Sequence, residues 1–382
     1  MVDLHFMAAP FVFGKLAVEK NFTNRKQELE RLLFNFSSLT STILISPRRW
    51  GKSSLVAKAA VQAQQKNKKL KFCFIDLFNI RTEEQFYQLL AQQVLKASAS
   101  KLEEITENAK NFFGQIIPKI SFSPDNVSEI SLGLDWKEVK KNPDDILNLP
   151  EKIAKAKGVN FVICIDEFQN IAELPNQLAV QKKLRANWQK HQNVTYCLYG
   201  SKRHMLMDVF TSSSMPFYKF GDIIFLEKIA ETDWIRFIKK KFKETGKTIA
   251  SSEAKAIAQL VECHPYYVQQ LAQQTWFRTN VNCSAEIVQD AHESLILQLS
   301  LLFQTITDEL TSTQVNYLKA MIRNEKHLSS KHTIEKYNLG TSANVLRIRK
   351  ALLKKEIIDK QGKSYIILDP LYKAWLKTIN LR

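Results

Sequence analysis

The sequence has little glycine, few cysteines and no long apolar run. Only 10 of its 382 residues are glycine, so a glycine in a short loop marks a place where the backbone needs one. The five cysteines are Cys73, Cys164, Cys197, Cys263 and Cys283. They form no CxxC pair, which excludes a zinc knuckle or a dithiol redox motif and is typical of a reducing compartment. No apolar run approaches the roughly 20 residues that cross a bilayer, and Met1–Gly14 lacks the features of a secretion signal. We therefore expect a cytoplasmic protein without a membrane partner.

Acidic residues are also in deficit. There are 38 Asp and Glu against 55 Lys and Arg, a formal net charge of +17. This excess favours a polyanionic partner, most simply nucleic acid. The alternative is a basic surface without such a ligand. The hydrophobic share of 45% is enough for a large core with at least one further domain.

Apolar runs alternate with helical patterns in the first 230 residues. Five runs are predicted to be strands: Thr42–Ile45, Leu70–Ile75, Asn160–Ile165, Val194–Tyr199 and Ile223–Leu226. The runs are too continuous for a sheet with one exposed face, so the fold class is α/β, a parallel sheet sandwiched by helices. Ile120–Trp136 alternates around Ser123–Asn126, which predicts a hairpin insertion. The pattern of Asp144–Lys157 predicts one helix.

The first strand leads into a loop with the features of a phosphate-binding site. The loop comprises Ser46, Pro47, Arg48, Arg49, Trp50, Gly51, Lys52, Ser53 and Ser54, and a helical stretch follows it. Backbone amides of the loop and the helix N-terminus would face the phosphates of ATP, and Gly51 lets the backbone approach them. Lys52 would reach the β- and γ-phosphates, and Ser53 would ligate Mg²⁺. Ser46 replaces the first glycine of the motif and should restrict the loop entry. A chance Gly-Lys-Ser is the alternative.

Two acids end the strand Asn160–Ile165, at the edge where α/β sheets bind ligands. Asp166 would hold Mg²⁺, and Glu167 would act as the general base that polarises the attacking water. Ser201 follows the next strand and could orient that water. The alternative is a strand that merely ends at polar residues.

Four other basic residues each have two possible roles. Lys202, Arg203 and His204 could sense the γ-phosphate or form a solvated helix start. Arg185 could serve a neighbouring subunit as an arginine finger or be a surface charge.

The pattern changes after residue 230. We expect a P-loop core at 1–230, a helical lid at 231–305, and a winged helix-turn-helix at 306–382, where three short helices precede a hairpin. The third helix and wing carry Arg347, Arg349, Lys350, Lys354, Lys355, Lys360 and Lys363. These could contact DNA phosphates, or the domain could bind a protein.

Several short segments resemble one family. They are the box Phe22–Leu29, the loop Pro47–Leu55, the "DEFQ" Walker B segment Asp166–Gln169, Gly200-Ser201, the lid motif His264–Tyr267, and Leu368–Leu371 with Trp375. Together they resemble the archaeal-type ATPase family, which is AAA+/STAND-like. The resemblance implies a P-loop ATPase core, a lid and a winged helix, and it places Pro265 in the nucleotide site. Cys263 stands where the family usually has glycine.

Three functions fit these patterns, and the third has the least support. The first is an Mg-dependent ATPase that acts on DNA through the winged helix. The second is a nucleotide-gated switch or scaffold that binds a protein partner or assembles as a homo-oligomer, with little turnover. A nucleotide-free DNA-binding adaptor is the third, but Lys52, Ser53, Asp166 and Glu167 argue against it.

Overall fold

The computed structural model describes residues 9–17, 21–99, 119–122, 130–133, 143–362 and 364–380. The chain divides into two units by its internal contacts. We call Arg25–Glu227 the core unit, and Met1–Asn24 together with Lys228–Arg382 the second unit. The boundaries expected at residues 230 and 305 stay a prediction.

The five predicted apolar runs form one parallel sheet in the core unit, which confirms the predicted fold class. In spatial order its strands are β2 (Leu70–Asp76), β5 (Asn160–Asp166), β6 (Val194–Gly200), β1 (Thr42–Ile45) and β7 (Asp222–Phe225). Parallel pairing aligns their carboxyl ends, so the phosphate-loop segment after β1 and the acids at the end of β5 reach the same edge.

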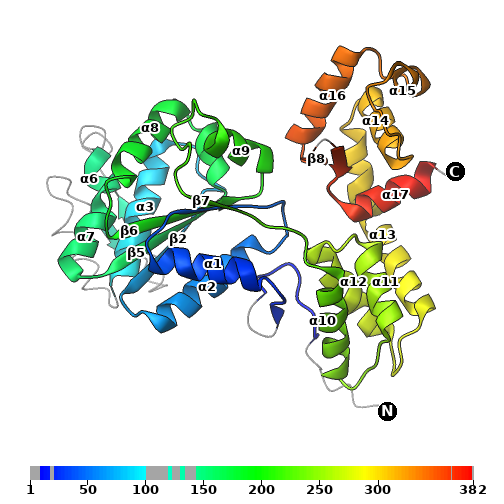
Figure 1. The fold of residues 1–382 in the computed structure, drawn as a ribbon, viewed down its shortest axis with the longest axis horizontal. Coiled ribbons are helices and arrows are strands. Elements are labelled where there is room, and N and C mark those ends of the chain that lie inside the picture. Colours follow the sequence, from blue (N-terminus) through cyan, green and yellow to red (C-terminus); the bar gives the residue numbers. More distant parts are fainter. Residues whose placement is uncertain are drawn as a thin grey trace. The chain divides into compact units, whose positions relative to one another are not determined.

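Helices cover both faces of this sheet (Figure 1). One face carries α1 (Lys26–Ser37) and α2 (Lys52–Lys66), and the other carries α3 (Glu83–Ser98), α7 (Leu149–Lys157) and α8 (Gln177–Trp188). In β5 the middle residues Phe161 to Ile165 are all fully buried. Burial on both faces explains why the strand reads as a continuous apolar run.

The segment 144–157, whose pattern predicts one helix, is broken in two. The helix α6 (Pro143–Leu147) ends before Asn148, and α7 begins after it. The Asn148 side-chain amide donates to the Asp144 carbonyl at 2.8 Å and to Asn187 Oδ1 at 2.8 Å. The break therefore serves a tertiary contact with α8 that local propensity does not reveal.

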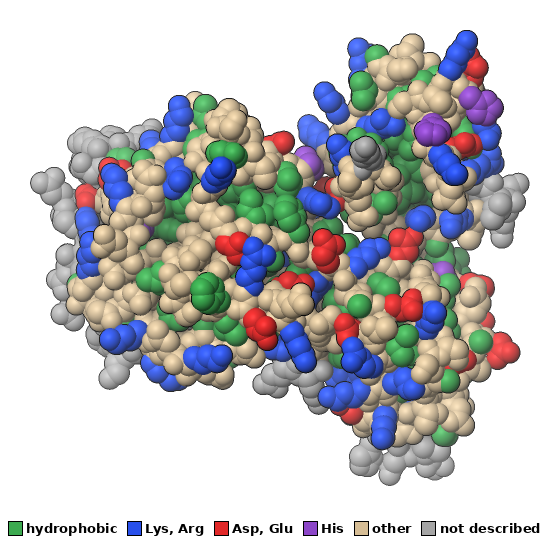
Figure 2. Space-filling view, viewed as in Figure 1, with side chains coloured by type: hydrophobic (Ala, Val, Ile, Leu, Met, Phe, Trp, Pro, Cys, Tyr) green, Lys and Arg blue, Asp and Glu red, His purple; other side chains and the backbone are tan. Residues whose placement is uncertain are grey.

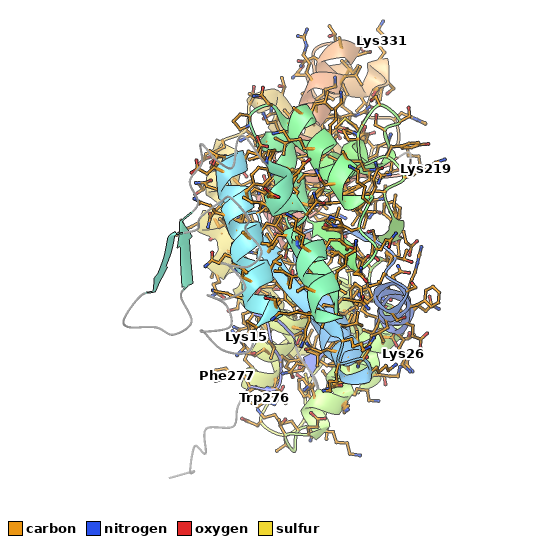
Figure 3. The ribbon with its side chains drawn as sticks, turned by 90° about the vertical axis from the view of Figure 1, so that its left-hand side faces the viewer. Lys15, Lys26, Lys219, Trp276, Phe277 and Lys331 are labelled. Atoms are coloured by element: carbon orange, nitrogen blue, oxygen red, sulfur yellow. The ribbon has the colours of Figure 1, made fainter. Side chains whose placement is uncertain are left out.

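The predicted hairpin insertion is present. Strands β3 (Lys119–Phe122) and β4 (Ile130–Gly133) pair antiparallel and lie at the side of the core unit, as Figure 3 shows. The predicted turn at Ser123–Asn126 falls outside the described residues.

The C-terminal part of the second unit starts with the helices α10 (Glu231–Lys243), α11 (Ser251–Leu260), α12 (Pro265–Arg278) and α13 (Ala285–Asp308). The winged helix follows as α14 (Ser312–Ile322), α15 (Lys331–Lys336), α16 (Ser342–Lys354), β8 (Ile358–Gln361), β9 (Ser364–Ile367) and α17 (Pro370–Asn380). The predicted order of three helices and two strands is confirmed, and α17 is an addition. One hydrophobic cluster contains Phe11 of the N-terminal segment together with residues from Ile229 to Leu376 in α17. Across the described part of the chain, none of the helices meets the length and hydropathy needed to span a bilayer.

Candidate functional site

The loop between β1 and α2 is shaped to leave a helix N-terminus open. Gly51 is the N-cap of α2, with a left-handed φ of 88°, and no side chain caps the helix at this position. The first amides of a helix lack intrahelical acceptors, and together with the helix dipole they favour an anion. Nothing lies within 4 Å of a Cβ built on Gly51. Its backbone angle, rather than crowding, is what calls for glycine there.

Ser46 occupies the loop entry without the strain that the missing glycine suggests. Its φ is not positive, its side chain is buried, and its hydroxyl donates to the Pro47 carbonyl at 3.1 Å. A Cβ is therefore accommodated at this position, and the departure from the motif does not distort the loop.

Lys52 and Ser53, in the first turn of α2, meet the two acids of β5. Ser53 Oγ donates to Asp166 Oδ2 at 2.8 Å. Lys52 Nζ donates to Glu167 Oε1 at 3.2 Å and lies 3.8 Å from Asp166 Oδ1. The structure thus brings together four of the predicted site residues, from two segments more than a hundred positions apart.

Glu167 is held by several donors besides Lys52. Ser201 Oγ donates to Glu167 Oε2 at 2.9 Å, and the Ser201 amide donates to the same oxygen at 3.3 Å. The Gln169 side-chain amide also donates to Glu167 Oε2. Arg48 Nε, from the loop, donates to Ser201 Oγ at 3.3 Å. Glu167 itself has a left-handed φ of 50°, which is uncommon outside glycine and typical of functional positions.

The two carboxyl groups have pKa values that move in opposite directions. Burial raises the pKa of Asp166, and the neighbouring Lys52 charge and the Ser53 hydrogen bond only partly offset this. Burial also tends to raise the pKa of Glu167. There the Lys52 charge and the hydrogen bonds from Gln169 and Ser201 outweigh burial and leave the pKa below its usual value. Glu167 is therefore a carboxylate at neutral pH, as a base must be.

Gln169 has a structural role that its place in the "DEFQ" motif does not predict. Gln169 is buried at 1% exposure, and its Oε1 would lie 1.9 Å from a Cβ on Gly200. Glycine at position 200 thus makes room for the side chain that holds Glu167. The "DEFQ" motif was the available signal, but the contact depends on the neighbouring strand.

Three of the basic residues with two predicted roles each make contacts within the core unit. The Arg185 guanidinium lies 5.0 Å from the centre of the Phe220 ring. Lys202 pairs with Glu173 at 2.8 Å, and Arg203 lies 5.7 Å from the Phe225 ring centre. All three side chains therefore make contacts inside the core unit. Pro265 begins α12 in the second unit, so its role at the nucleotide site stays a prediction.

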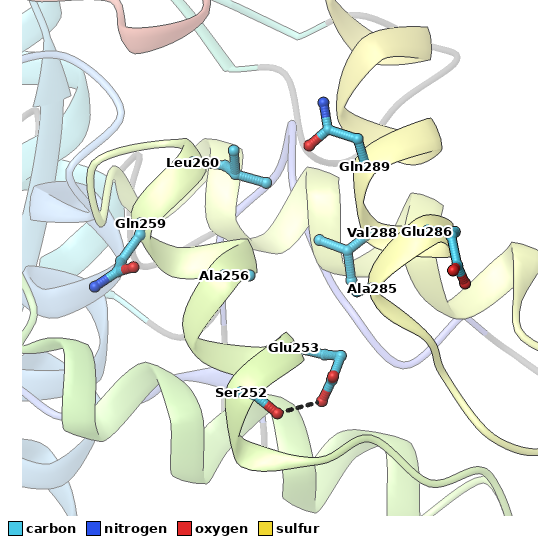
Figure 4. Close-up of a pocket in the computed structure, with 9 residues that line it drawn as sticks. All are labelled: Ser252, Glu253, Ala256, Gln259, Leu260, Ala285, Glu286, Val288 and Gln289. Atoms are coloured by element: carbon cyan, nitrogen blue, oxygen red, sulfur yellow. Dashed lines mark hydrogen bonds between the residues drawn. The ribbon is translucent and has the colours of Figure 1, made fainter.

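A groove in the second unit has different chemistry. It lies between α11 and the start of α13, with a volume of about 660 Å³ (Figure 4). Ala256, Leu260 and Val288 line it, and its charged lining residues are Glu253 and Glu286. Two carboxylates repel a polyphosphate, so the loop after β1 is the better candidate for a nucleotide site.

The winged helix presents some of the predicted basic residues and uses others internally. Arg347, Lys350, Lys354 and Lys360 are exposed. Figure 2 shows basic side chains gathered over this part of the chain. Arg349 instead is half-buried and donates to the Tyr317 hydroxyl at 2.8 Å. Lys355 is also exposed and pairs with Glu309 at 3.1 Å. Lys363 falls outside the described residues.

The parallel sheet, the loop after β1 and the acids at the end of β5 define a P-loop NTPase fold. Residues 22–271 match the model of a family described as an ATPase domain predominantly from Archaea, and residues 301–378 match a "Probable winged helix domain". The chain belongs to this archaeal-type ATPase family.

Solved structures share this fold. A Walker-type ATPase of Pyrococcus abyssi is 16% identical, with 95% of this chain and 98% of that chain covered and a TM-score of 0.65. An ORC2 protein of Aeropyrum pernix in ADPNP and ADP complexes is 12% identical, with 98% and 99% covered and a TM-score of 0.58. An ORC1 protein of the same organism in complex with DNA is 12% identical, with 95% and 96% covered and a TM-score of 0.50. No curated protein matches the chain.

Proposed function

We propose that the protein binds Mg-ATP at the loop after β1 and hydrolyses it. The observation that carries the proposal is the meeting of Lys52 and Ser53 with Asp166 and Glu167 at one sheet edge. The oxygens of Ser53 and Asp166, 2.8 Å apart, are hard ligands of the kind that Mg²⁺ takes in nucleotide sites. Membership of an ATPase family supports the same reading.

The proposed chemistry follows from where each side chain lies. When bound, Mg²⁺ would neutralise charge that develops on the phosphates. The loop amides and Lys52 would bind and orient the triphosphate. Glu167 would accept a proton from the attacking water, and Ser201, which already donates to Glu167, would keep that carboxylate in place.

A specific observation favours slow turnover. Glu167 is engaged by Lys52, Ser201 and Gln169, so its oxygens must exchange a partner before they can orient water. Binding of the phosphates would draw Lys52 away from Glu167 and begin that exchange. A nucleotide-gated switch with a protein partner or a second copy is therefore the alternative function.

We also propose that the winged helix binds DNA through the exposed side of α16. The net charge of +17 supports this, as do the exposed Arg347 and Lys350. The DNA complex of the similar ORC1 protein adds support from a chain of the same fold. A cytoplasmic location fits the five free cysteines.

The decisive experiment measures nucleotide binding and turnover in the nucleotide-stripped protein, with and without duplex DNA. Lys52→Ala should abolish binding of Mg-ATP. Glu167→Gln should bind Mg-ATP while turnover falls by roughly 10²-fold or more, because the amide cannot accept the proton. Lys66→Ala, at the far end of α2, is the control and should behave as wild type.

The outcome separates the candidates. Turnover that DNA stimulates supports the DNA-acting ATPase. Tight binding with turnover near background, with or without DNA, supports the switch. Normal hydrolysis by Glu167→Gln would show that Glu167 is not the base.

A further inference from the structure

The buried Arg25 lies where the chain passes between its two units. The backbone crosses the boundary twice, between Asn24 and Arg25 and again between Glu227 and Lys228. Arg25 is only 5% exposed, although arginine is rarely buried unless it is paired. The hydrogen-bond acceptors around its guanidinium should therefore explain why Arg25 is buried.

Three segments of the core unit supply acceptors to this one guanidinium. It donates to the Trp50 carbonyl in the phosphate loop at 3.2 Å, to the Glu227 carbonyl, and to Glu28 Oε1 at 3.1 Å. Trp50 directly precedes Gly51, the N-cap of α2, while Glu227 is the last residue before the second crossing. The Arg25 side chain thus contacts both the phosphate loop and the residue before the second crossing, while its own backbone lies at the first crossing.

The backbone at the first crossing is strained. Asn24 and Arg25 have φ values of 56° and 66°, two consecutive left-handed residues without a glycine. Such conformations persist only where surrounding contacts fix them. Asn24 donates to Asp233 at the start of α10 in the second unit, and Arg25 bonds within the core unit. Each side of the crossing is therefore anchored in its own unit.

We propose that Arg25 is a positioning residue that couples nucleotide occupancy of the phosphate loop to the position of the second unit. Phosphate binding reorganises the amides around Gly51, so the Trp50 carbonyl shifts or changes its hydrogen bond. The rigid fork of Arg25 passes that change to Glu227 and to the strained crossing beside it. This proposal rests on the proposed nucleotide site.

Small-angle X-ray scattering of the full chain tests the coupling without labels. Profiles are compared for nucleotide-free protein and for protein with Mg-ADP or with Mg and a non-hydrolysable ATP analogue, while calorimetry measures nucleotide binding. We expect the wild-type radius of gyration to change with nucleotide. Arg25→Ala should still bind Mg-ADP, within about tenfold in affinity, but should lose that change.

The control is Arg31→Ala on α1, the helix that begins directly after Arg25, because Arg31 is half exposed and pairs with Asp222 rather than with the loop. It should keep the nucleotide-dependent change. If Arg25→Ala does not fold by circular dichroism, Arg25→Lys carries the test, since it keeps the buried charge but loses the fork.

The possible failures differ. A wild-type protein that binds no nucleotide overturns the proposed function, and the coupling with it. A wild type that binds nucleotide with an unchanged profile overturns the coupling alone. So does an Arg25 variant that keeps the wild-type change.

Discussion

Gly200 shows how a residue without a side chain shapes the site. A Cβ there would meet Gln169 Oε1 at 1.9 Å, and Gln169 in turn holds Glu167. The close approach links a backbone position on β6 to the carboxylate proposed as the base.

Gly200→Ala should therefore destabilise the protein by about 1–3 kcal/mol through overpacking, and should lower turnover because Gln169 is displaced. Urea unfolding and an ATPase assay measure the two effects. Gly158→Ala is the comparison: nothing lies within 4 Å of its Cβ, and φ is +61°. It should cost about 1 kcal/mol and leave turnover unchanged. Equal turnover in both variants would exclude a role for the Gly200 contact.

Ser201 offers a test by pH. Its hydroxyl is one of the donors that lower the pKa of Glu167. In the proposed mechanism the ionised form of Glu167 is the base, so turnover should fall on the acid side as this carboxylate is protonated. Ser201→Ala removes one donor, so the pKa of Glu167 should rise. The acid limb of kcat/KM should move to higher pH, and an unmoved limb would show that Ser201 does not tune the base.

At the scale of elements, the joint between α6, α7 and α8 depends on a neutral histidine. His191 Nε2 lies 3.0 Å from Asn148 Oδ1, which can only accept, so this nitrogen donates. His191 Nδ1 then accepts from the Tyr196 hydroxyl at 2.9 Å. Burial lowers the pKa of His191 to about 4, because the charged ring would be desolvated.

This arrangement predicts acid sensitivity with a definite sign. The unfolded chain takes up a proton near pH 6.5 and the folded chain only near pH 4, so stability falls as pH drops through that window. The free energy of unfolding of the wild type should fall on the order of 2 kcal/mol more than that of His191→Gln between pH 7 and 4.5. Chemical denaturation at the two pH values measures this. Equal losses in both proteins would rule out His191 as the source.

The elements themselves were largely predictable, whereas their contacts were not. The strands of the parallel sheet are apolar on both faces, so their ends were predicted to within about one residue. The break at Asn148 was missed because its causes lie on α8 and in the turn after it. The proximity of Lys52 and Glu167 was predictable, because each follows a strand of a parallel sheet and the carboxyl ends of these strands lie at the same edge. The contacts of Gln169 and Arg25 needed coordinates, because their partners are distant in sequence and include backbone carbonyls.

Residues with a left-handed backbone also differ in whether the sequence predicts their conformation. Cys263 stands where the family usually has glycine, and its φ is 55°. The sequence thus marked a left-handed position after α11. The left-handed Glu167 carried no comparable mark, since its conformation is imposed by the site around it.

At the scale of the whole molecule, the basic excess should act through a few exposed side chains. If α16 contacts DNA phosphates, the double variant Arg347→Ala, Lys350→Ala should weaken binding to all sequences alike. It should also reduce the slope of log K against log salt by about 2. Fluorescence anisotropy over a salt series measures the slope. Lys66→Ala is the control, since Lys66 is an exposed lysine on α2 of the core unit rather than on the winged helix. An unchanged slope in the double variant would move the DNA contact elsewhere.

The order of the sheet has a consequence for synthesis of the chain. Among the strands that the structure describes, β1 pairs with β6 and β7 alone, and the first of these leaves the ribosome about 150 residues after β1 does. At 5–20 residues per second, that delay is roughly 8–30 s. During this interval the apolar Thr42–Ile45 segment has no partner strand and is a target for chaperones. Translation pauses before Val194 would prolong this exposure, and a truncated product that ends there would lack both strands that pair with β1.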